Sequence, residues 1–214
     1  MYLPKYFAET DVAALHRLIG EHPFGTLVTR TAGGIEANHL PFELHPQPPT
    51  FGTLHCHVAR ANPVWQEALA DTEALIIFQG PSGYISPSWY PTKQESGEVV
   101  PTWNYAVVHA RGPLRIIEDR EWLRGLVTRL TEHHEAGSKE PWQVGDAPAP
   151  FIDQLLGAIV GIEIPMRALT GKWKLSQNRP AGDRHGVVRS LAERGDGAAQ
   201  ALAAMMQERN GSKT

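Results

Sequence analysis

The chain has a single cysteine, Cys56, so it cannot form an intrachain disulfide. Its longest clean apolar run, residues 74–78, is far too short to span a bilayer, and no basic segment followed by an apolar stretch opens the chain. Neither sign of charge dominates, because 20 lysines and arginines stand against 23 aspartates and glutamates, a formal net charge of −3. These absences predict a cytoplasmic protein without a membrane span and without a global attraction to nucleic acid.

Several chemical signatures are also missing. No G-x-G-x-x-G segment follows a predicted strand and no Walker A loop is present, so neither kind of nucleotide site is expected. Residues 80–83 lack the spacing of a nucleophile elbow. His133, His134 and Glu135 do not form a zincin pattern, and one cysteine among ten histidines argues against a structural zinc site.

His55 and His57 lie two residues apart on a predicted strand and therefore on one face. With a third residue they could bind a metal, but we favour a pair of half-buried or cofactor-facing histidines and expect no metal ligand. Cys56 falls between them on the opposite face, where no base accompanies it. It is predicted to be a core residue rather than a nucleophile.

Seventeen prolines and twenty glycines divide the chain into short strands. Gly33 and Gly34 predict a hairpin turn. The predicted strands are residues 24–30, 35–44, 51–58, 74–79, 83–86, 102–117 (broken at Gly112) and 158–169. Few helices separate them, so we expect a mainly β protein with some α structure, an antiparallel barrel with peripheral helices rather than a doubly wound fold.

Capping and periodicity predict helices over residues 11–22 and 62–71, and from the cap Asp119 onward. Two short helices near residues 184–194 and 198–209 close the chain. The stretches 87–100, 136–150 and 171–180 are predicted to be a long loop, a linker and a basic irregular segment. We therefore expect a barrel domain over residues 1–170, followed by a basic loop and a C-terminal helical pair over residues 171–214.

Three segments combine groups that suit a ligand. Residues 57–63 join a strand end, Arg60 and a helix start, which favours a phosphate but equally fits a capped helix with a solvated arginine. Residues 101–105 open a strand with polar and aromatic side chains on opposite faces, which suits a ring ligand or an aromatic core corner. Residues 172–178 bring together two lysines and a tryptophan, and could close over an anionic aromatic ligand or form a solvated loop.

These segments occur together with others in an order and spacing that resemble the PaiB family, from the first residue to about residue 195. The segments that carry the resemblance are Met1-Tyr-Leu-Pro-Lys-Tyr-Phe7, Gly25-Thr-Leu-Val-Thr29, Asn38-His-Leu-Pro-Phe42, His57-Val-Ala-Arg-Ala-Asn-Pro63, Ile85-Ser-Pro-Ser-Trp-Tyr90, Val100-Pro-Thr-Trp-Asn-Tyr105 and Lys174-Leu-Ser-Gln-Asn178. The resemblance implies an FMN-binding negative transcriptional regulator with the split-barrel fold of the pyridoxamine-phosphate oxidase and flavin reductase group. It also implies a homodimer, with flavin in a groove at the subunit interface.

The resemblance further implies which residues contact the cofactor. The strand backbone from Thr26 to Thr29 would face the flavin ring, Arg60 would hold the phosphate, and residues 103–104 would touch the ring or the ribityl chain. The lysine-rich segment would close the site. The full set is Thr26, Leu27, Val28, Thr29, His57, Arg60, Ala61, Asn62, Trp103, Asn104, Lys174, Ser176 and Gln177.

Three functions stay open from the sequence. A flavin-dependent oxidoreductase would use the cofactor for the chemistry, with His57 or Tyr105 as a candidate acid or base and no residue established as catalytic. A haem-binding split barrel would use one of the histidines 55, 57 and 109.

A DNA-binding repressor is the third function. Residues 167–194 carry seven basic and two acidic side chains, a local net charge of 7 − 2 = +5. The last two predicted helices have helix–turn–helix spacing, but the second offers a surface of alanine and methionine that is poor for reading bases. We therefore favour a structural helical pair, and direct DNA binding is only weakly supported.

Overall fold

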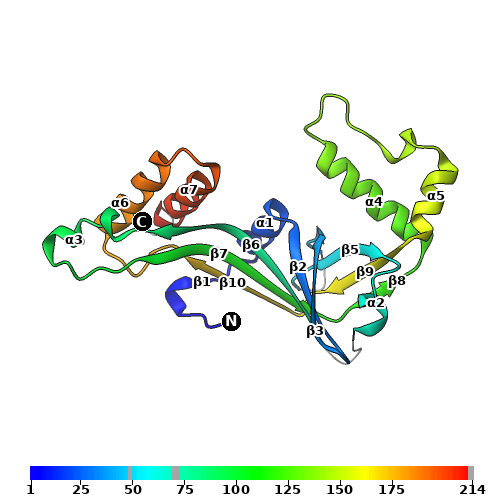
Figure 1. Ribbon diagram of the computed structural model, residues 1–214, viewed down its shortest axis with the longest axis horizontal. Coiled ribbons are helices and arrows are strands. Elements are labelled where there is room, and N and C mark those ends of the chain that lie inside the picture. Colours follow the sequence, from blue (N-terminus) through cyan, green and yellow to red (C-terminus); the bar gives the residue numbers. More distant parts are fainter. Residues whose placement is uncertain (48–49, 69–72, 212–214) are drawn as a thin grey trace. The chain divides into compact units, whose positions relative to one another are not determined.

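A computed structural model describes residues 1–47, 50–68 and 73–211 (Figure 1). The chain forms two compact units, which we call the first and the second unit. The first comprises Met1–Leu18, Gln79–Val108 and Thr170–Thr214, and the second comprises Ile19–Phe78 and His109–Leu169. Helix α1 (Val12–Glu21) and strands β6 (Ala74–Ile85), β7 (Thr102–Gly112) and β10 (Ala168–Lys174) run from one unit into the other.

The first unit combines antiparallel strands with a pair of C-terminal helices. Its strand order is β1-β10-β7-β6, with β1 pairing antiparallel to β10. Helices α6 and α7 lie side by side, and α6 also contacts the 3₁₀ turn η2 (Figure 1). Its further elements are η1 (Lys5–Phe7), β1 (Ala8–Glu9), η2 (Pro87–Trp89), α3 (Thr92–Glu95), α6 (Ala181–Glu193) and α7 (Gly197–Gly211).

The second unit holds a hairpin and a separate four-stranded sheet. Strands β2 and β3 pair antiparallel from Phe24↔Pro41 to Thr31↔Gly34, and β2 also pairs with β6. The four-stranded sheet has the order β4-β5-β9-β8, and every neighbouring pair in it is antiparallel. The elements of the second unit are β2 (Phe24–Thr31), β3 (Gly34–Pro41), β4 (Glu43–His45), β5 (Thr53–Ala59), α2 (Val64–Glu67), β8 (Arg115–Ile117), α4 (Arg120–Glu135), η3 (Val144–Asp146), α5 (Ala149–Gly157) and β9 (Ile159–Pro165).

Helix α4 shows how the local sequence builds the second unit. Asp119 caps it by accepting a hydrogen bond from the backbone N–H of Trp122 at 2.7 Å, as predicted. Its apolar face buries Leu123 and Leu126. The Trp122 ring lies directly over Gly161 of β9, where a Cβ atom would come within 2.4 Å of the ring. A glycine in the strand therefore lets the helix approach the sheet closely.

The predicted elements with strong local signals are present. Strand β2, the hairpin at Gly33–Gly34, helix α4 and the C-terminal helical pair all form. Cys56 is a buried free thiol, as expected for a core residue, and burial raises its pKa. Among the helices of the described residues, none combines the length and apolar character needed to cross a membrane.

Several boundaries were predicted wrongly. The two pieces expected at 74–79 and 83–86 are one strand, β6, and the single strand expected at 158–169 is two, β9 and β10. Strand β10 also occupies the start of the segment expected to be irregular. Helix α5 begins within the predicted linker, and helix α2 ends at Glu67 rather than continuing toward residue 71, of which residues 69–71 lie outside the described part.

Candidate functional site

The sequence-predicted cofactor residues divide between the two units. Residues 103, 104, 174, 176 and 177 belong to the first unit, and residues 26–29, 57 and 60–62 belong to the second. Each group has its own geometry.

A buried polar pair anchors the group of the first unit. Asn104 on β7 is 0% exposed, and its Nδ2 donates to Ser176 Oγ at 2.9 Å and lies 3.5 Å from Met206 Sδ. Ser176 Oγ donates in return to Asn104 Oδ1 at 3.2 Å. Ser176 has a φ of 64°, in the left-handed region that side chains other than glycine seldom adopt. The Asn104 amide is therefore a buried structural group, and its hydrogen bonds to the Ser176 hydroxyl hold residue 176 in place.

Lys174, the cation of this group, is fixed by two short hydrogen bonds. Its Nζ donates to Thr102 Oγ1 and to Trp103 O, each at 2.6 Å. Burial, followed by repulsion from Lys172 and Arg179, lowers the pKa of Lys174. Lys172 Nζ donates to Tyr2 O at 3.0 Å. Within the part of the chain that the structure describes, no carboxylate forms an ion pair with Lys172 or Lys174, so this region is electropositive.

Trp103, whose backbone oxygen accepts from Lys174, also exposes an aromatic surface. Its side chain is 52% exposed and meets the half-exposed Tyr84 ring edge to face, with the ring centres 6.4 Å apart. Gln177 is engaged locally, because its amide receives a hydrogen bond from Leu175 N and donates one to Trp173 O. Trp103 and Lys174 are thus the members of the group that a ligand can most readily reach.

Arg60 is the cation among the predicted cofactor residues of the second unit, and it already forms an ion pair with Glu118. Its Nε donates to Gly157 O at 3.0 Å, and its two terminal nitrogens lie 2.6 Å from Glu118 Oε1 and 3.2 Å from Ile159 O. A phosphate at Arg60 would therefore have to compete with the Glu118 carboxylate.

The helix start next to Arg60 is similarly engaged. Asn62 Oδ1 accepts from Val64 N at 3.0 Å, while Asn62 Nδ2 donates to Asn38 Oδ1 at 2.7 Å. The Asn62 backbone N–H donates to Ala59 O at 2.8 Å, and Ala61 lies exposed in the intervening turn. Because α2 is a single turn with Pro63, not the predicted Asn62, at its N-cap, this segment is a short turn tied to β3 through Asn38 rather than a long helix with open amides.

The strand predicted to face the flavin ring, β2, has a neighbouring strand on each side. Thr26, Leu27 and Val28 on β2 pair with β3 on one side and with β6 on the other. Backbone contacts from these residues to a flavin would compete with the hydrogen bonds of the sheet. Thr29 is buried, and its Oγ1 is one of the few buried polar atoms without a hydrogen-bond partner among the described residues.

His57 lines a cavity of about 360 Å³ in the second unit. Its Nδ1 is buried and has no hydrogen-bond partner, and burial lowers its pKa. The other lining residues, drawn from β3, α4 and the segment after it, are Pro41, Val127, Leu130, Thr131, His134, Glu135 and Trp142. The walls of this open cavity are mostly apolar, with a few polar groups among them.

A family model described as "Putative FMN-binding domain" matches residues 1–168. The chain belongs to this family. Relatives include the Protease synthase and sporulation protein PAI 2 of Bacillus subtilis, 34% identical and covering 98% of each chain. An uncharacterised protein of Emericella nidulans is also 34% identical, over 98% of this chain and 97% of its own. The resemblance inferred from the motifs is confirmed.

Solved structures confirm the fold class, an antiparallel split barrel with peripheral helices, and α6 and α7 form the expected C-terminal helical pair. The flavocytochrome Anf3 of Azotobacter vinelandii superposes with a TM-score of 0.61 at 12% identity, over 80% of this chain and 72% of its own. The FAD and heme binding protein of Mycobacterium smegmatis has a TM-score of 0.59 at 16% identity, over 83% and 78%. At these identities the likeness concerns the fold alone.

The FMN-binding family match ends before part of the predicted site. Lys174, Ser176 and Gln177 follow residue 168, whereas the alignment with the Bacillus subtilis relative covers nearly the whole chain. Sequence reasoning missed Tyr84 as a neighbour of Trp103, and it noted Lys172 beside Lys174 without including Lys172 among the cofactor residues. The alternation of Lys172, Trp173 and Lys174, typical of a strand with one polar face, could have indicated strand β10 in place of an irregular segment.

The buried imidazole of His57 predicts a pH dependence of stability. Because burial lowers its pKa in the folded state, the unfolded chain takes up a proton there at a higher pH than the folded chain does. Its contribution is complete above the ordinary histidine pKa of about 6.5 and declines as the pH falls from that value toward the folded pKa. We expect His57→Gln to reduce the loss of unfolding free energy between about pH 7.5 and about pH 5.5, measured by urea titration. An equally steep loss in the variant would contradict the assignment.

Proposed function

We propose that this chain binds FMN and that Lys174 contacts the flavin phosphate. The proposal rests on the buried Lys172 and the partly buried Lys174, which have no carboxylate partner in the described structure, and on Trp103, whose backbone oxygen accepts from Lys174 and whose side chain is about half exposed. A flavin mononucleotide offers a phosphate dianion and a large aromatic ring, which match a cation and an indole respectively. Membership of the FMN-binding family supports the choice of this ligand.

A free N–H donor on Lys174 and the neighbouring cations would favour a dianion at this position. The Lys174 Nζ has three N–H donors, of which two are directed to Thr102 Oγ1 and Trp103 O. The third can donate to a phosphate oxygen. A dianion would also offset the repulsion among the cations, which, after burial, lowers the Lys174 pKa. Arg60, which the resemblance placed at the phosphate, is by contrast paired with Glu118.

The experiment compares FMN with riboflavin, which has the same ring and no phosphate. We expect Lys174→Ala to weaken FMN binding by about 10- to 100-fold, the loss of one charge-assisted hydrogen bond of about 1.5–3 kcal/mol, and to leave riboflavin binding nearly unchanged. Lys93→Ala is the matched control, because Lys93 is an exposed lysine of the first unit. Titration followed by flavin absorbance and fluorescence gives both affinities.

Two outcomes would count against this assignment. A colourless protein that fails to bind added FMN would remove the flavin proposal altogether, and a Soret band on addition of haem would instead favour the haem alternative. A larger loss in Arg60→Ala than in Lys174→Ala, confined to FMN, would place the phosphate at the turn before α2.

We also propose that the protein is a homodimer with FMN at the subunit interface. The first unit exposes large apolar side chains that a partner could cover: Tyr2 is 84% exposed, Val100 is 65% exposed, and Trp103 is about half exposed. The family resemblance supplies the position of the flavin. Sedimentation equilibrium is expected to give twice the chain mass, and a Trp103→Ser variant is expected to shift the equilibrium toward the monomer.

For biological role we propose regulation, which is what the resemblance to the PaiB family implies; the Bacillus subtilis relative is named a protease synthase and sporulation protein. The C-terminal pair does not resemble a free recognition surface, because α7 buries Leu202, Ala203 and Met206. Two arginines near it are also engaged, Arg184 with Arg179 O and Arg194 with Asp196. We therefore expect no gel shift with duplex DNA at low salt. A salt-dependent shift would instead support direct repression, and NAD(P)H turnover with FMN bound would support an oxidoreductase.

A further inference from the structure

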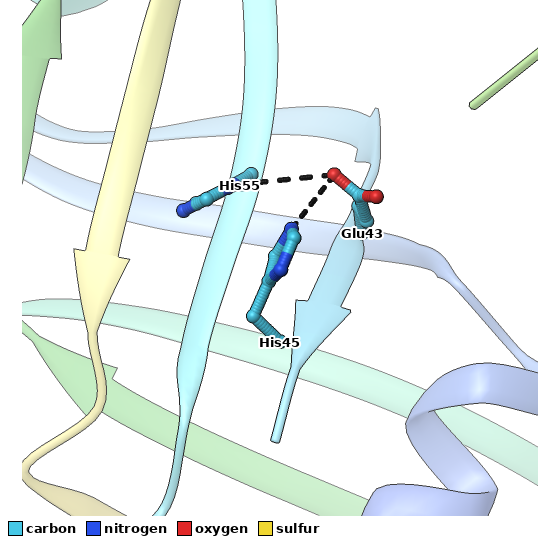
Figure 2. A group of neighbouring side chains, drawn as sticks. All are labelled: Glu43, His45 and His55. Atoms are coloured by element: carbon cyan, nitrogen blue, oxygen red, sulfur yellow. Dashed lines mark ion pairs between the residues drawn. The ribbon is translucent and has the colours of Figure 1, made fainter. Parts of the chain in front are cut away.

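A cluster of two histidines and a glutamate lies on the four-stranded sheet of the second unit (Figure 2). Glu43 and His45 are two residues apart on β4 and therefore share a face. His55 on β5 is directly opposite Glu43 in the antiparallel register. The side chains converge on one carboxylate oxygen: Glu43 Oε2 lies 2.9 Å from His45 Nε2 and 3.9 Å from His55 Nδ1.

The two ring nitrogens that face Glu43 have no hydrogen-bond partner. His45 Nε2 and His55 Nδ1 are both buried atoms that neither donate nor accept a hydrogen bond among the described residues. His45 Nε2 approaches the carboxylate to hydrogen-bond distance without the direction of a hydrogen bond. Buried nitrogens of this kind are costly unless something else satisfies them.

The surrounding contacts orient the three side chains. His55 Nε2 lies 3.3 Å from Glu163 Oε2 on β9, its cross-strand neighbour. A hydrogen on Nε2 would satisfy this contact, and Nδ1 would then present a lone pair toward Glu43 and His45. Arg129 of α4 donates hydrogen bonds to both carboxylate oxygens of Glu43, at 2.7 and 2.9 Å. In that tautomer a lone pair and a carboxylate oxygen face one another without a hydrogen bond between them, an arrangement that a cation would stabilise.

We propose that His45 Nε2, His55 Nδ1 and Glu43 Oε2 bind a divalent transition-metal ion, with Zn²⁺ the best match. Two imidazoles and one carboxylate are a common set of protein ligands for zinc, and water completes such three-ligand sites. Around a tetrahedral zinc, ligand atoms lie about 3.3 Å apart, so the 2.9 and 3.9 Å separations require only small side-chain movements. The partly exposed side chains of His45 and Glu43 leave a path for that water.

The neighbouring groups match those that usually support a metal-binding histidine. A carboxylate on the far nitrogen of His55, here Glu163, fixes the ring and raises its basicity. Arg115 in turn holds Glu163 at 3.0 Å. Arg129 shares Glu43 Oε2 with the proposed ion, and its positive charge opposes the ion. We therefore expect an affinity below that of closed zinc sites with four protein ligands.

This site differs from the pair considered in the sequence. His55 and His57 share a face of β5, but His57 lines the cavity beside α4, whereas His55 turns to Glu43 and His45. The proposal also revises the expectation that the chain has no metal ligand. It is independent of flavin binding, because none of its three ligand residues belongs to the proposed FMN contacts.

Zinc titration of the full-length protein tests the site. After dialysis against chelator, calorimetry with ZnCl₂ is expected to show one ion per chain, and Co²⁺ is expected to produce visible bands of a four-coordinate site. His45→Gln should raise the Zn²⁺ dissociation constant at least about 100-fold, since the loss of an outer contact alone costs about 10- to 100-fold. Glu163→Gln, which removes such an outer contact, should raise it about 10-fold.

The matched control is His39→Gln, because His39 is an exposed histidine on β3 of the same unit. It should leave Zn²⁺ affinity and stoichiometry unchanged, and circular dichroism without metal should show that every variant is folded. Equal weakening by His39→Gln and His45→Gln, or no saturable Zn²⁺ binding to the parent protein, would overturn the proposal and leave the cluster as histidine–glutamate ion pairs. FMN titration of the same samples is expected to be unaffected by His45→Gln, which separates this site from the flavin.

Discussion

Gly186→Ala is expected to destabilise the protein by about 3 kcal/mol, the upper end of the cost of overpacking. Gly186 lies on the buried face of α6, where a Cβ atom would come within 2.1 Å of the carbonyl oxygen of Trp89 in η2. That oxygen belongs to the backbone, so it cannot turn aside as a flexible side chain would. The helix would have to move away from η2, which would open the packing of the first unit. Urea unfolding measures the loss.

Gly182→Ala is the matched control on the same helix. A Cβ atom at Gly182 would find its nearest neighbour, Pro91 Cγ, at 4.0 Å, which is an ordinary contact. Because alanine favours the helix over glycine by about 0.5–1 kcal/mol, this variant should be as stable as the parent or slightly more stable. Equal unfolding midpoints for the two variants would show that α6 is not held against η2 as described.

Ser176→Ala is expected to cost about 1–3 kcal/mol, because it leaves the buried amide of Asn104 without its hydroxyl partner. Ser176→Gly removes the same hydroxyl but relieves the left-handed backbone at φ 64°, which costs a residue with a Cβ atom about 1–2 kcal/mol. The glycine variant should therefore be more stable than the alanine variant by about 1 kcal/mol.

Thermal and urea unfolding of both variants separate the two contributions. Equal stability of Ser176→Ala and Ser176→Gly would indicate that the backbone of residue 176 relaxes without cost. If both matched the parent protein, the Asn104–Ser176 pair would have no net value for the fold. Because Lys174 lies two residues earlier, the same variants also report whether FMN affinity depends on this rigid turn.

Where tertiary contacts override local preference, sequence reasoning was wrong. Lysines favour solvent, so residues 171–180 were expected to be irregular, yet Lys172 is buried in β10. Its ammonium group donates to Tyr2 O and lies over the rings of Tyr2 and Tyr105. Glycine and proline at residues 80–81 were expected to interrupt a strand, yet β6 continues through them. The Leu18 side chain packs onto Gly80, where a Cβ atom would lie 2.9 Å from it.

The sequence by itself determined the elements that depend on neighbouring residues. The Asp119 cap, the hairpin at Gly33–Gly34 and the alternating burial of β2 all rest on interactions within a few positions. The ordered motifs, from the opening Met-Tyr-Leu-Pro segment to residues 174–178, were also sufficient to indicate the family, which the matching family model confirms. From the family followed the split-barrel fold.

Only the tertiary structure decided which distant side chains meet. It paired Arg60 with Glu118, brought Lys174 to residues 102–103, and set His55 between Glu43 and Glu163. These meetings depend on the register in which strands far apart in the sequence pair, and a shift of one residue would turn every side chain to the other face. Register is selected by the packing of the whole sheet, so no local window of sequence contains it.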